Sequence, residues 1–284
     1  MTRSIKLAIS SLAWEPAQDQ AVRALFVQRG VRGVELAPLK YWSSAPEVAP
    51  NALADYRAEW ADAGVSIVAL QGILFGRPDL RLFGSVEQRA SLEQHLAGMA
   101  AVAEGLGAGV LVFGAPGNRL RGTLTEEAAI ASAAPSLRRV AAACEARGCM
   151  LCIEPNPLRY GGDFVRDLTE ATRLVQAVGH PGFGLHIDSG AIAINTEPDA
   201  EVVRAAGVAR HFHISEVDLV PVGSGSVDHR RIGRSLREGG YDGWLSIEMR
   251  PLDPARLLVD MEQAIDVAQE AYFSPSDAGS ARQK

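Results

Sequence analysis

Four potential metal ligands lie at or near the ends of four short apolar segments in the second half of the chain. They are Glu154 in MLCIE, Asp188 in FGLHID, His213 in ARHFHISE and Glu248 in WLSIE. Residues at the carboxyl ends of parallel strands face the mouth of a closed barrel, so four strands can direct four ligands to one point. Two glutamates, an aspartate and a histidine suit a hard or borderline divalent cation. We expect Mn²⁺, with Mg²⁺, Co²⁺ or Zn²⁺ as alternatives.

A cation held in this way would leave coordination positions for two adjacent oxygens of a hydroxy-ketone. Binding of a carbonyl and its neighbouring hydroxyl acidifies the C–H between them and stabilises the resulting enediolate. One carboxylate beside the metal can then remove the proton and another can return it. Glu154 and Glu248 are the candidates for this catalytic pair. The competing interpretation is that all four are strand-end residues in ordinary ion pairs, but their occurrence on four successive strands favours the metal.

The elements that must position these ligands alternate regularly along the chain. Short β-rich apolar runs alternate with longer Ala- and Arg-rich segments of helical period, as in repeated βα units. Strands are expected at residues 5–10, 33–36, 66–71, 110–113, 150–154, 184–188, 209–214 and 245–248. Helices are expected at 17–29, 52–63, 87–106, 126–147, 167–178, 199–206, 228–238 and 254–272. Eight such units predict an α/β fold, a single (β/α)8 TIM barrel.

Glycines follow most of the expected helices and indicate left-handed helix stops. They are Gly30, Gly64, Gly107, Gly148, Gly179, Gly207, Gly239 and Gly240. A doubly wound open sheet is the structural alternative, because it uses the same βα alternation. It requires a glycine-rich phosphate turn after an early strand, whereas the first strand here leads into SLAWEP. The closed barrel is therefore the better interpretation.

Length and composition fit one catalytic domain over residues 1–273, followed by a flexible polar tail at 274–284. The 284 residues exceed the roughly 250 typical of such a barrel only slightly, and 47% of them are hydrophobic. No apolar run approaches the roughly 18 residues of a membrane span, and the N-terminus leaves no room for a signal peptide. We expect a cytoplasmic protein that does not associate with membranes.

The net charge and the cysteine content limit which binding partners and which disulfides are expected. A net charge of −6 offers no basic surface for nucleic acid. Three cysteines argue against a disulfide framework, and the CxxC pattern of Cys149 and Cys152 lies across the start of a strand, where side chains alternate faces. A small-molecule sugar or sugar phosphate is the expected partner. Apolar residues on the outer loops are compatible with a homodimer.

The sequence resembles the xylose-isomerase-like sugar isomerase and epimerase barrels, the superfamily of D-tagatose 3-epimerase and hydroxypyruvate isomerase. The resemblance rests on CIEPNP, LHIDSGA, HFHISE and LSIEM, and on PVGSGSVDHRRI before YDGWLSIE. It extends from Lys6 to about Tyr272. In the epimerases the matching positions bind the metal, and the glutamates of strands five and eight transfer the proton. The resemblance thus implies the same roles for the four residues that the chemistry singles out.

The chain departs from the epimerase pattern at two positions. Ala191 stands where the epimerases usually carry a histidine, three positions after the strand-six aspartate. Leu219 stands where they carry a substrate-binding arginine, six positions after the metal histidine. The second acid often found after the strand-five glutamate is not obvious either. Metal binding is therefore predicted more firmly than substrate identity.

Further residues are candidates for binding the substrate, each with a structural alternative. His186 precedes Asp188 by two positions, as His211 precedes His213, so each histidine is expected one layer deeper on the inward face. Each of these two histidines either orients a metal ligand or is a hydrogen-bonded histidine of the barrel core. The remaining substrate-binding candidates lie in the loops after strands one, two, four and seven, where surface or structural roles are the alternative: Trp14, Lys40, Asn118, Arg119 and Glu216.

The function predicted from the sequence is a metal-dependent isomerase or epimerase of a sugar or sugar phosphate, acting by proton transfer through a metal-bound enediolate. A lyase or dehydratase is the first alternative, because the same acidified C–H can be followed by loss of a β-substituent. A nuclease related to endonuclease IV would need more metal ligands and a basic face. A non-catalytic sugar-binding subunit is the remaining alternative.

Overall fold

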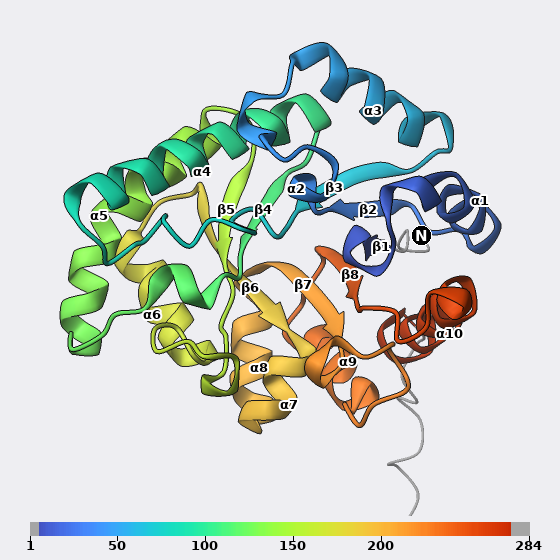
Figure 1. The fold of residues 1–284 in the computed structure, drawn as a ribbon. Coiled ribbons are helices and arrows are strands. Elements are labelled where there is room, and N and C mark those ends of the chain that lie inside the picture. Colours follow the sequence, from blue (N-terminus) through green and yellow to red (C-terminus); the bar gives the residue numbers. More distant parts are fainter. Residues whose placement is uncertain (1–5, 274–284) are drawn as a thin grey trace, which may run out of the picture.

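Eight parallel strands pair in chain order and close into a barrel, with β8 returning to β1 (Figure 1). The strands are β1 (Leu7–Ser10), β2 (Gly33–Leu36), β3 (Ser66–Leu70), β4 (Val110–Phe113), β5 (Met150–Ile153), β6 (Phe183–Asp188), β7 (Ala209–Ser215) and β8 (Trp244–Glu248). This computed structural model describes residues 6–273. The predicted (β/α)8 barrel is confirmed, and from β2 onward the strand ends differ from expectation by at most one residue.

Helices surround the ring of strands, and the first and last major helices lie side by side where the barrel closes (Figure 1). They are α1 (Asp19–Arg29), α2 (Pro38–Tyr41), α3 (Pro50–Asp62), α4 (Val86–Leu106), α5 (Glu126–Glu145), α6 (Leu168–Val178), α7 (Ser189–Asn195), α8 (Asp199–Ala206), α9 (His229–Glu238) and α10 (Leu257–Ala268). Short 3₁₀ or π segments lie at Ser11–Ala13, Pro16–Gln18, Ala45–Glu47, Pro116–Arg119, Leu158–Tyr160, Val217–Leu219, Pro254–Arg256 and Gln269–Phe273. Helices α2 and α7 were not expected, because each is too short to show a helical period in sequence.

Two hydrophobic clusters stabilise the barrel. The larger one joins strands to helices and includes the fully buried Phe26, Phe113 and Phe212. The smaller one groups Ala8, Val68 and Ala69 with the partly buried Val110 and Trp244. A Cβ on Gly33 would lie 2.8 Å from the Trp244 ring, so this glycine leaves the space that the indole fills. Since side chains alternate along β8, Trp244 shares its face with Ser246 and Glu248.

The pairing register is interrupted at two places. Between β2 and β3 it shifts at Val34 and Glu35, and between β6 and β7 it shifts at Leu185 and His186. Irregularities of this kind bend a strand locally and redirect its side chains. Both occur immediately before a polar residue that is completely buried, Glu35 and His186. Both interruptions of the register therefore coincide with a buried polar side chain.

Most of the expected glycine stops adopt the left-handed conformation. Positive φ angles occur at Gly30, Gly64, Gly107, Gly148, Gly179 and Gly240. The expectation was wrong for Gly207 and Gly239, whose φ angles are −64° and −74°. Each donates its backbone N–H within a right-handed final turn. Helix α8 ends at Ala206 without a left-handed residue, whereas the expected Gly239–Gly240 stop after α9 does reach the left-handed conformation, at Gly240.

Several other expectations concern composition. All three cysteines are free and buried, in agreement with the absence of a disulfide framework. Within residues 6–273, none of the helices is both long and apolar enough to cross a membrane. The expected polar tail at 274–284 lies outside the described residues.

Substitution of Gly182 by alanine should destabilise the barrel. The added Cβ would lie 2.1 Å from the carbonyl oxygen of Ala141 in α5, which forces helix and strand apart. We expect a loss of about 1–3 kcal/mol in the free energy of unfolding, measured by urea denaturation. Gly109→Ala is the matched control, because Gly109 also directly precedes a strand and a Cβ there has no neighbour within 4 Å. Equal stability of the two variants would contradict this account of the packing.

Candidate metal centre

The structure brings the four ligand candidates together at the mouth of the barrel. One ligand atom each from Glu154, Asp188, His213 and Glu248 lies within 4.8 Å of all the others. Asp188 and Glu248 are the last residues of β6 and β8, His213 lies in β7, and Glu154 directly follows β5. The three carboxylates are slightly accessible and the histidine is fully buried. The arrangement is open on the side from which a small molecule would enter.

The carboxylate of Asp188 is held by two hydrogen bonds. Its Oδ1 accepts from the backbone N–H of Ala191 at 2.6 Å, and its Oδ2 accepts from the hydroxyl of Ser215 at 2.5 Å. The first bond caps the N-terminus of α7, a position where aspartate is strongly preferred. The unexpected helix α7 therefore starts at the ligand itself and fixes its orientation.

Space for Glu154 is provided by Gly114 at the end of β4. A Cβ on this glycine would lie 1.8 Å from Oε2 of Glu154, so no other residue fits there while the carboxylate keeps its position. The backbone carbonyl of Glu154 in turn accepts a hydrogen bond from Arg119 at 2.6 Å. The side chain and the backbone of Glu154 are thus both positioned by neighbours from β4 and from the loop that follows it.

Burial and the nearby negative charges shift the pKa values of the ligand candidates. Burial raises the pKa of Glu154, with the charge of Glu248 adding to the effect. Burial and the same two glutamates raise the pKa of Asp188 to about 7. Burial disfavours the charged form of His213, yet the carboxylates around it hold its pKa well above the usual range. Three carboxylates that repel one another and a histidine that attracts protons form a donor set that fits a divalent cation.

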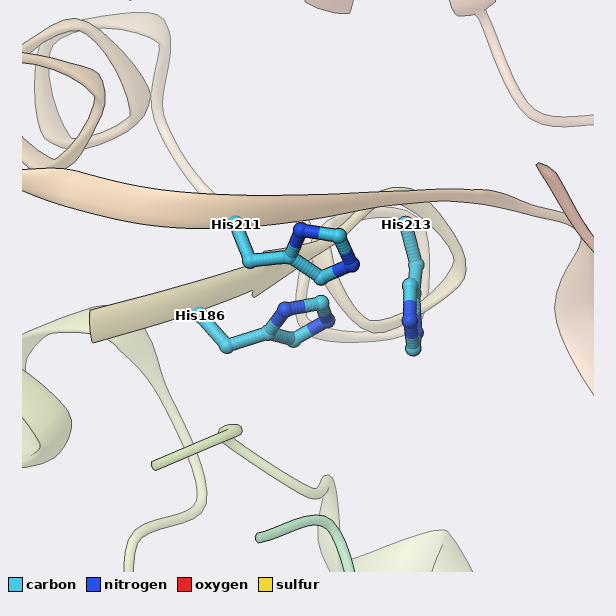
Figure 2. A group of neighbouring side chains, drawn as sticks. All are labelled: His186, His211 and His213. Atoms are coloured by element: carbon cyan, nitrogen blue, oxygen red, sulfur yellow. The ribbon is translucent and has the colours of Figure 1, made fainter. Parts of the chain in front are cut away.

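Beneath the ligands lies a layer of histidines. Figure 2 shows the rings of His186 and His211 one above the other, with His213 at their tips. The ring centroid of His186 lies 5.4 Å from that of His211 and 4.1 Å from that of His213. Nε2 of His186 lies 3.6 Å from Oε1 of Glu154. Burial and the neighbouring histidines hold the pKa of His186 well below its usual range, so its ring is neutral.

The sequence reasoning missed Glu35 in β2. This residue has no exposed surface, and its Oε2 lies 2.9 Å from Nε2 of His213. Its Oε1 lies 3.3 Å from Nε2 of His211. Burial opposes its charge, but the two histidines outweigh burial and hold its pKa well below the usual range. The available signal was a single acid inside the apolar strand GVEL, a position where an unpaired charge is costly.

Two candidates for substrate binding, Trp14 and Lys40, lie away from the ligands. Trp14 is buried and its indole N–H donates to the carboxylate of Asp19 at 2.7 Å. The ammonium of Lys40 donates to the backbone carbonyls of Ser11 and Trp14 at 3.1 and 2.6 Å. These contacts tie the loop after β1 to the loop after β2. They give both residues a structural role, and their expected contribution to substrate binding stays a prediction.

Arg119 is completely buried and does not face the site with its guanidinium group. It donates to the backbone carbonyl of Glu154, to the side-chain oxygen of Asn156 at 2.5 Å and to the carbonyl of Phe164 at 3.0 Å. Burial lowers its pKa to about 10, which leaves it charged at neutral pH. These hydrogen bonds hold the loop after β5, and the substrate-binding role expected of Arg119 stays a prediction.

Asn118 and Glu216 are committed to loop structure as well. The amide of Asn118 donates to two backbone carbonyls of the β3–α4 loop at 2.6 and 2.7 Å. Buried Glu216 accepts from the backbone N–H groups of Gly223 and Val227, at 3.1 and 3.0 Å, and lies 3.2 Å from Nε2 of His229. The pattern could not reveal these partners, because the direction of a loop side chain depends on the loop conformation.

A cavity of about 350 Å³ opens over the ligand set. Glu154, Asp188 and Glu248 line its base. The two positions that depart from the epimerase pattern, Ala191 and Leu219, line it too. Further lining residues that sequence reasoning did not single out for this site are Tyr160, Asp218 and Arg250. A larger cavity of about 690 Å³ beside α4 contains none of the four ligands.

The chain belongs to the family of xylose isomerase-like TIM barrels, whose model matches residues 24–270. Three solved structures show the same fold at low sequence identity. D-psicose 3-epimerase with D-tagatose from Clostridium cellulolyticum H10 has a TM-score of 0.79 at 16% identity, covering 95% of this chain and 100% of its own. The 3-keto-D-glucoside 4-epimerase YcjR from E. coli gives 0.75 at 17%, covering 92% and 98%. The IolI protein with a bound zinc atom gives 0.71 at 17%, covering 95% and 100%.

Arg119→Met should lower the free energy of unfolding by about 2–4 kcal/mol, because several buried oxygens lose their hydrogen-bond donor. Urea denaturation measures the change. Arg159→Met is the control: Arg159 is exposed and its guanidinium contacts only Asp218, so we expect at most about 1 kcal/mol there. A small effect of Arg119→Met would mean that water or a rearranged loop replaces the guanidinium.

Proposed function

We propose that this protein is a divalent-metal-dependent isomerase or epimerase of a sugar or sugar phosphate. The observation that carries the proposal is the convergence of Glu154, Asp188, His213 and Glu248 on one point beneath a cavity. Family membership supports an enzyme that acts on carbohydrates. Among the similar structures, the D-psicose 3-epimerase is bound to D-tagatose and IolI to zinc, and these ligands support the class of substrate and the metal.

The four residues would hold the cation, with Mn²⁺ as the first expectation from the mixed oxygen and nitrogen donors. When bound, the cation supplies Lewis-acid stabilisation of negative charge on two adjacent substrate oxygens. Asp188 and His213 serve only as ligands in this scheme. Their neighbours Ser215 and Glu35 orient them, so their positions do not depend on the substrate.

Glu154 and Glu248 exchange protons with the substrate carbon next to the carbonyl. One carboxylate oxygen takes the proton, and the other glutamate returns one. Return to the opposite face of the same carbon gives an epimer, whereas return to the neighbouring carbon gives an isomer. Without an ion, burial and the charge of Glu248 raise the pKa of Glu154; a bound cation would lower it again and keep the carboxylate ionised, the form that a general base needs.

Elimination is the second candidate reaction, favoured by one observation. Ala191 and Leu219 line the cavity where the resemblance leads one to expect a histidine and an arginine. Without these groups a substrate can sit differently over the glutamates, and the carbanion formed by proton removal can expel a β-substituent. Product mass separates the two reactions, since isomers have equal mass.

Metal binding should depend on Asp188. We expect the protein, treated with chelator and then dialysed against Mn²⁺ or Zn²⁺, to bind one ion per chain, and Asp188→Asn to bind it at least about tenfold more weakly. Elemental analysis and titration calorimetry measure both. The control is Asp218→Asn, because Asp218 lines the same cavity but lies outside the ligand set. Undiminished binding by Asp188→Asn would refute the proposed ligand set.

Proton exchange should depend on Glu248. We expect the metal-loaded protein to incorporate deuterium from D₂O next to the carbonyl of one member of a panel of ketoses, ketose phosphates and keto acids. Glu248→Gln should slow this exchange by about 10²-fold or more, since a positioned base contributes that much. Metal content is determined on the same samples, and Glu104→Gln serves as control, because Glu104 pairs with Arg147 and does not line the cavity. Elimination products without exchanged isomers would replace the isomerase by a lyase.

A further inference from the structure

We propose that Glu35 is the positioning residue of the metal centre: it binds the Nε2–H of His213 and thereby turns the free Nδ1 of this ring toward the other three ligands. The inference rests on the proposed metal site and assigns a role that the four ligand motifs do not contain. Its basis is that the two nitrogens of one imidazole face two different groups. Nε2 lies 2.9 Å from Glu35 Oε2, and Nδ1 lies 3.3 Å from Glu248 Oε2.

The chemistry of imidazole explains why the contact fixes the ligand. A histidine that binds a metal is neutral and carries one proton, so one ring nitrogen donates a hydrogen bond and the other offers its lone pair to the metal. An ionised carboxylate only accepts hydrogen bonds, so the nitrogen beside Glu35 must carry the proton. The lone pair is then on Nδ1, the nitrogen that faces Glu154 and Glu248. Carboxylates bonded to the second nitrogen of a ligand histidine also raise its basicity toward the metal.

Glu35 is itself held rigidly in the barrel interior. It is fully buried, and its second oxygen lies 3.3 Å from Nε2 of His211, at ion-pair distance but without a hydrogen bond within residues 6–273. The pairing register shifts just before Glu35, consistent with a side chain redirected by an irregular strand. Glu35 on β2 and the histidines on β7 belong to strands that do not pair with each other. The contact therefore crosses the interior and joins two separate parts of the barrel wall.

The competing explanation for the layer of histidines is that it binds a second metal ion. Ligand atoms of His186, His211 and His213 lie within 4.8 Å of one another. Both ring nitrogens of His186 are buried without a hydrogen-bond partner within residues 6–273. The distance of 2.9 Å between Glu35 and His213 is an ordinary hydrogen bond, and therefore we favour the positioning role. The number of bound ions decides between these two arrangements.

The test compares Glu35→Gln with Glu216→Gln. Glu216 is the matched control, because it is also a fully buried glutamate beside a histidine, His229, but lies outside the ligand set. Competition with a chromogenic chelator gives the Zn²⁺ and Mn²⁺ affinities of the full-length chain. We expect Glu35→Gln to bind about 10- to 100-fold more weakly than wild type and Glu216→Gln to stay within about threefold. Both variants lose stability, so the difference in affinity separates positioning from a purely structural role.

A measurement on the unsubstituted protein keeps the proposal testable even if Glu35→Gln does not fold. In the Zn²⁺-loaded protein with ¹⁵N-labelled histidine, NMR should show His213 protonated at Nε2 and metal-bound at Nδ1. A ring bound to zinc through Nε2 would overturn the proposal. Two zinc ions per chain, with one lost in Glu35→Gln, would overturn it in favour of the second metal site.

The outcomes also separate this inference from the proposed function. Loss of metal in Asp188→Asn together with wild-type affinity in Glu35→Gln would refute the positioning role and leave the metal centre in place. Absence of stoichiometric metal in the wild-type chain would refute the metal-dependent function first, and the positioning role with it.

Discussion

Repulsion among three buried carboxylates is the constraint on which the site depends. Glu154, Asp188 and Glu248 can remain together and ionised only if positive charge compensates them, and burial makes that compensation more necessary. His213 is the basic member of this cluster: its Nδ1 lies 3.3 Å from Glu248 Oε2, and its other nitrogen contacts Glu35. The divalent cation that we propose for this site would resolve the conflict. The same constraint explains why the acids are fixed by Ser215, Gly114 and a helix cap, since unrestrained they would separate.

The interior of the barrel follows from this requirement as a series of layers. Alternation along β8 places Trp244, Ser246 and Glu248 on one face, so the strand runs from an apolar floor to the ligand layer. His186 and Asp188 on β6, and His211 and His213 on β7, repeat this arrangement at the upper levels. Polar groups in the middle layer would be costly in an apolar core, yet here Glu35 and the histidines partly compensate one another. The layer of Glu35 and the histidines thus lies between the apolar floor at Trp244 and the carboxylates at the mouth of the barrel.

The ligand set could be predicted from the sequence because barrel geometry leaves little freedom at strand ends. Once the strands are located, closure brings their carboxyl ends together whatever the loops do. The loop partners of Arg119 and Glu216 could not be predicted, because the direction of a loop side chain depends on backbone contacts that no spacing reveals. Glu35 was missed for another reason: its partner His213 is 178 positions away and on a strand that does not pair with its own. Gly207 shows the same limit, since a glycine permits a left-handed stop without requiring it.

In the proposed function, the residues that would perform the reaction and the residues that would select the substrate lie in different parts of the fold. The ligands are anchored to strand ends, whereas the cavity above them is walled by residues of the loops after β5, β7 and β8, among them Tyr160, Leu219 and Arg250. Asp218 in this wall is paired with Arg159 at 2.5 Å, so loops after β5 and β7 are connected to each other across the cavity rim. Replacing a polar wall residue by an apolar one such as Leu219 changes which hydroxyl groups can be bound without moving any ligand. The proposed metal chemistry therefore rests on the strand ends, whereas the choice of sugar would rest on a wall that can change without moving them.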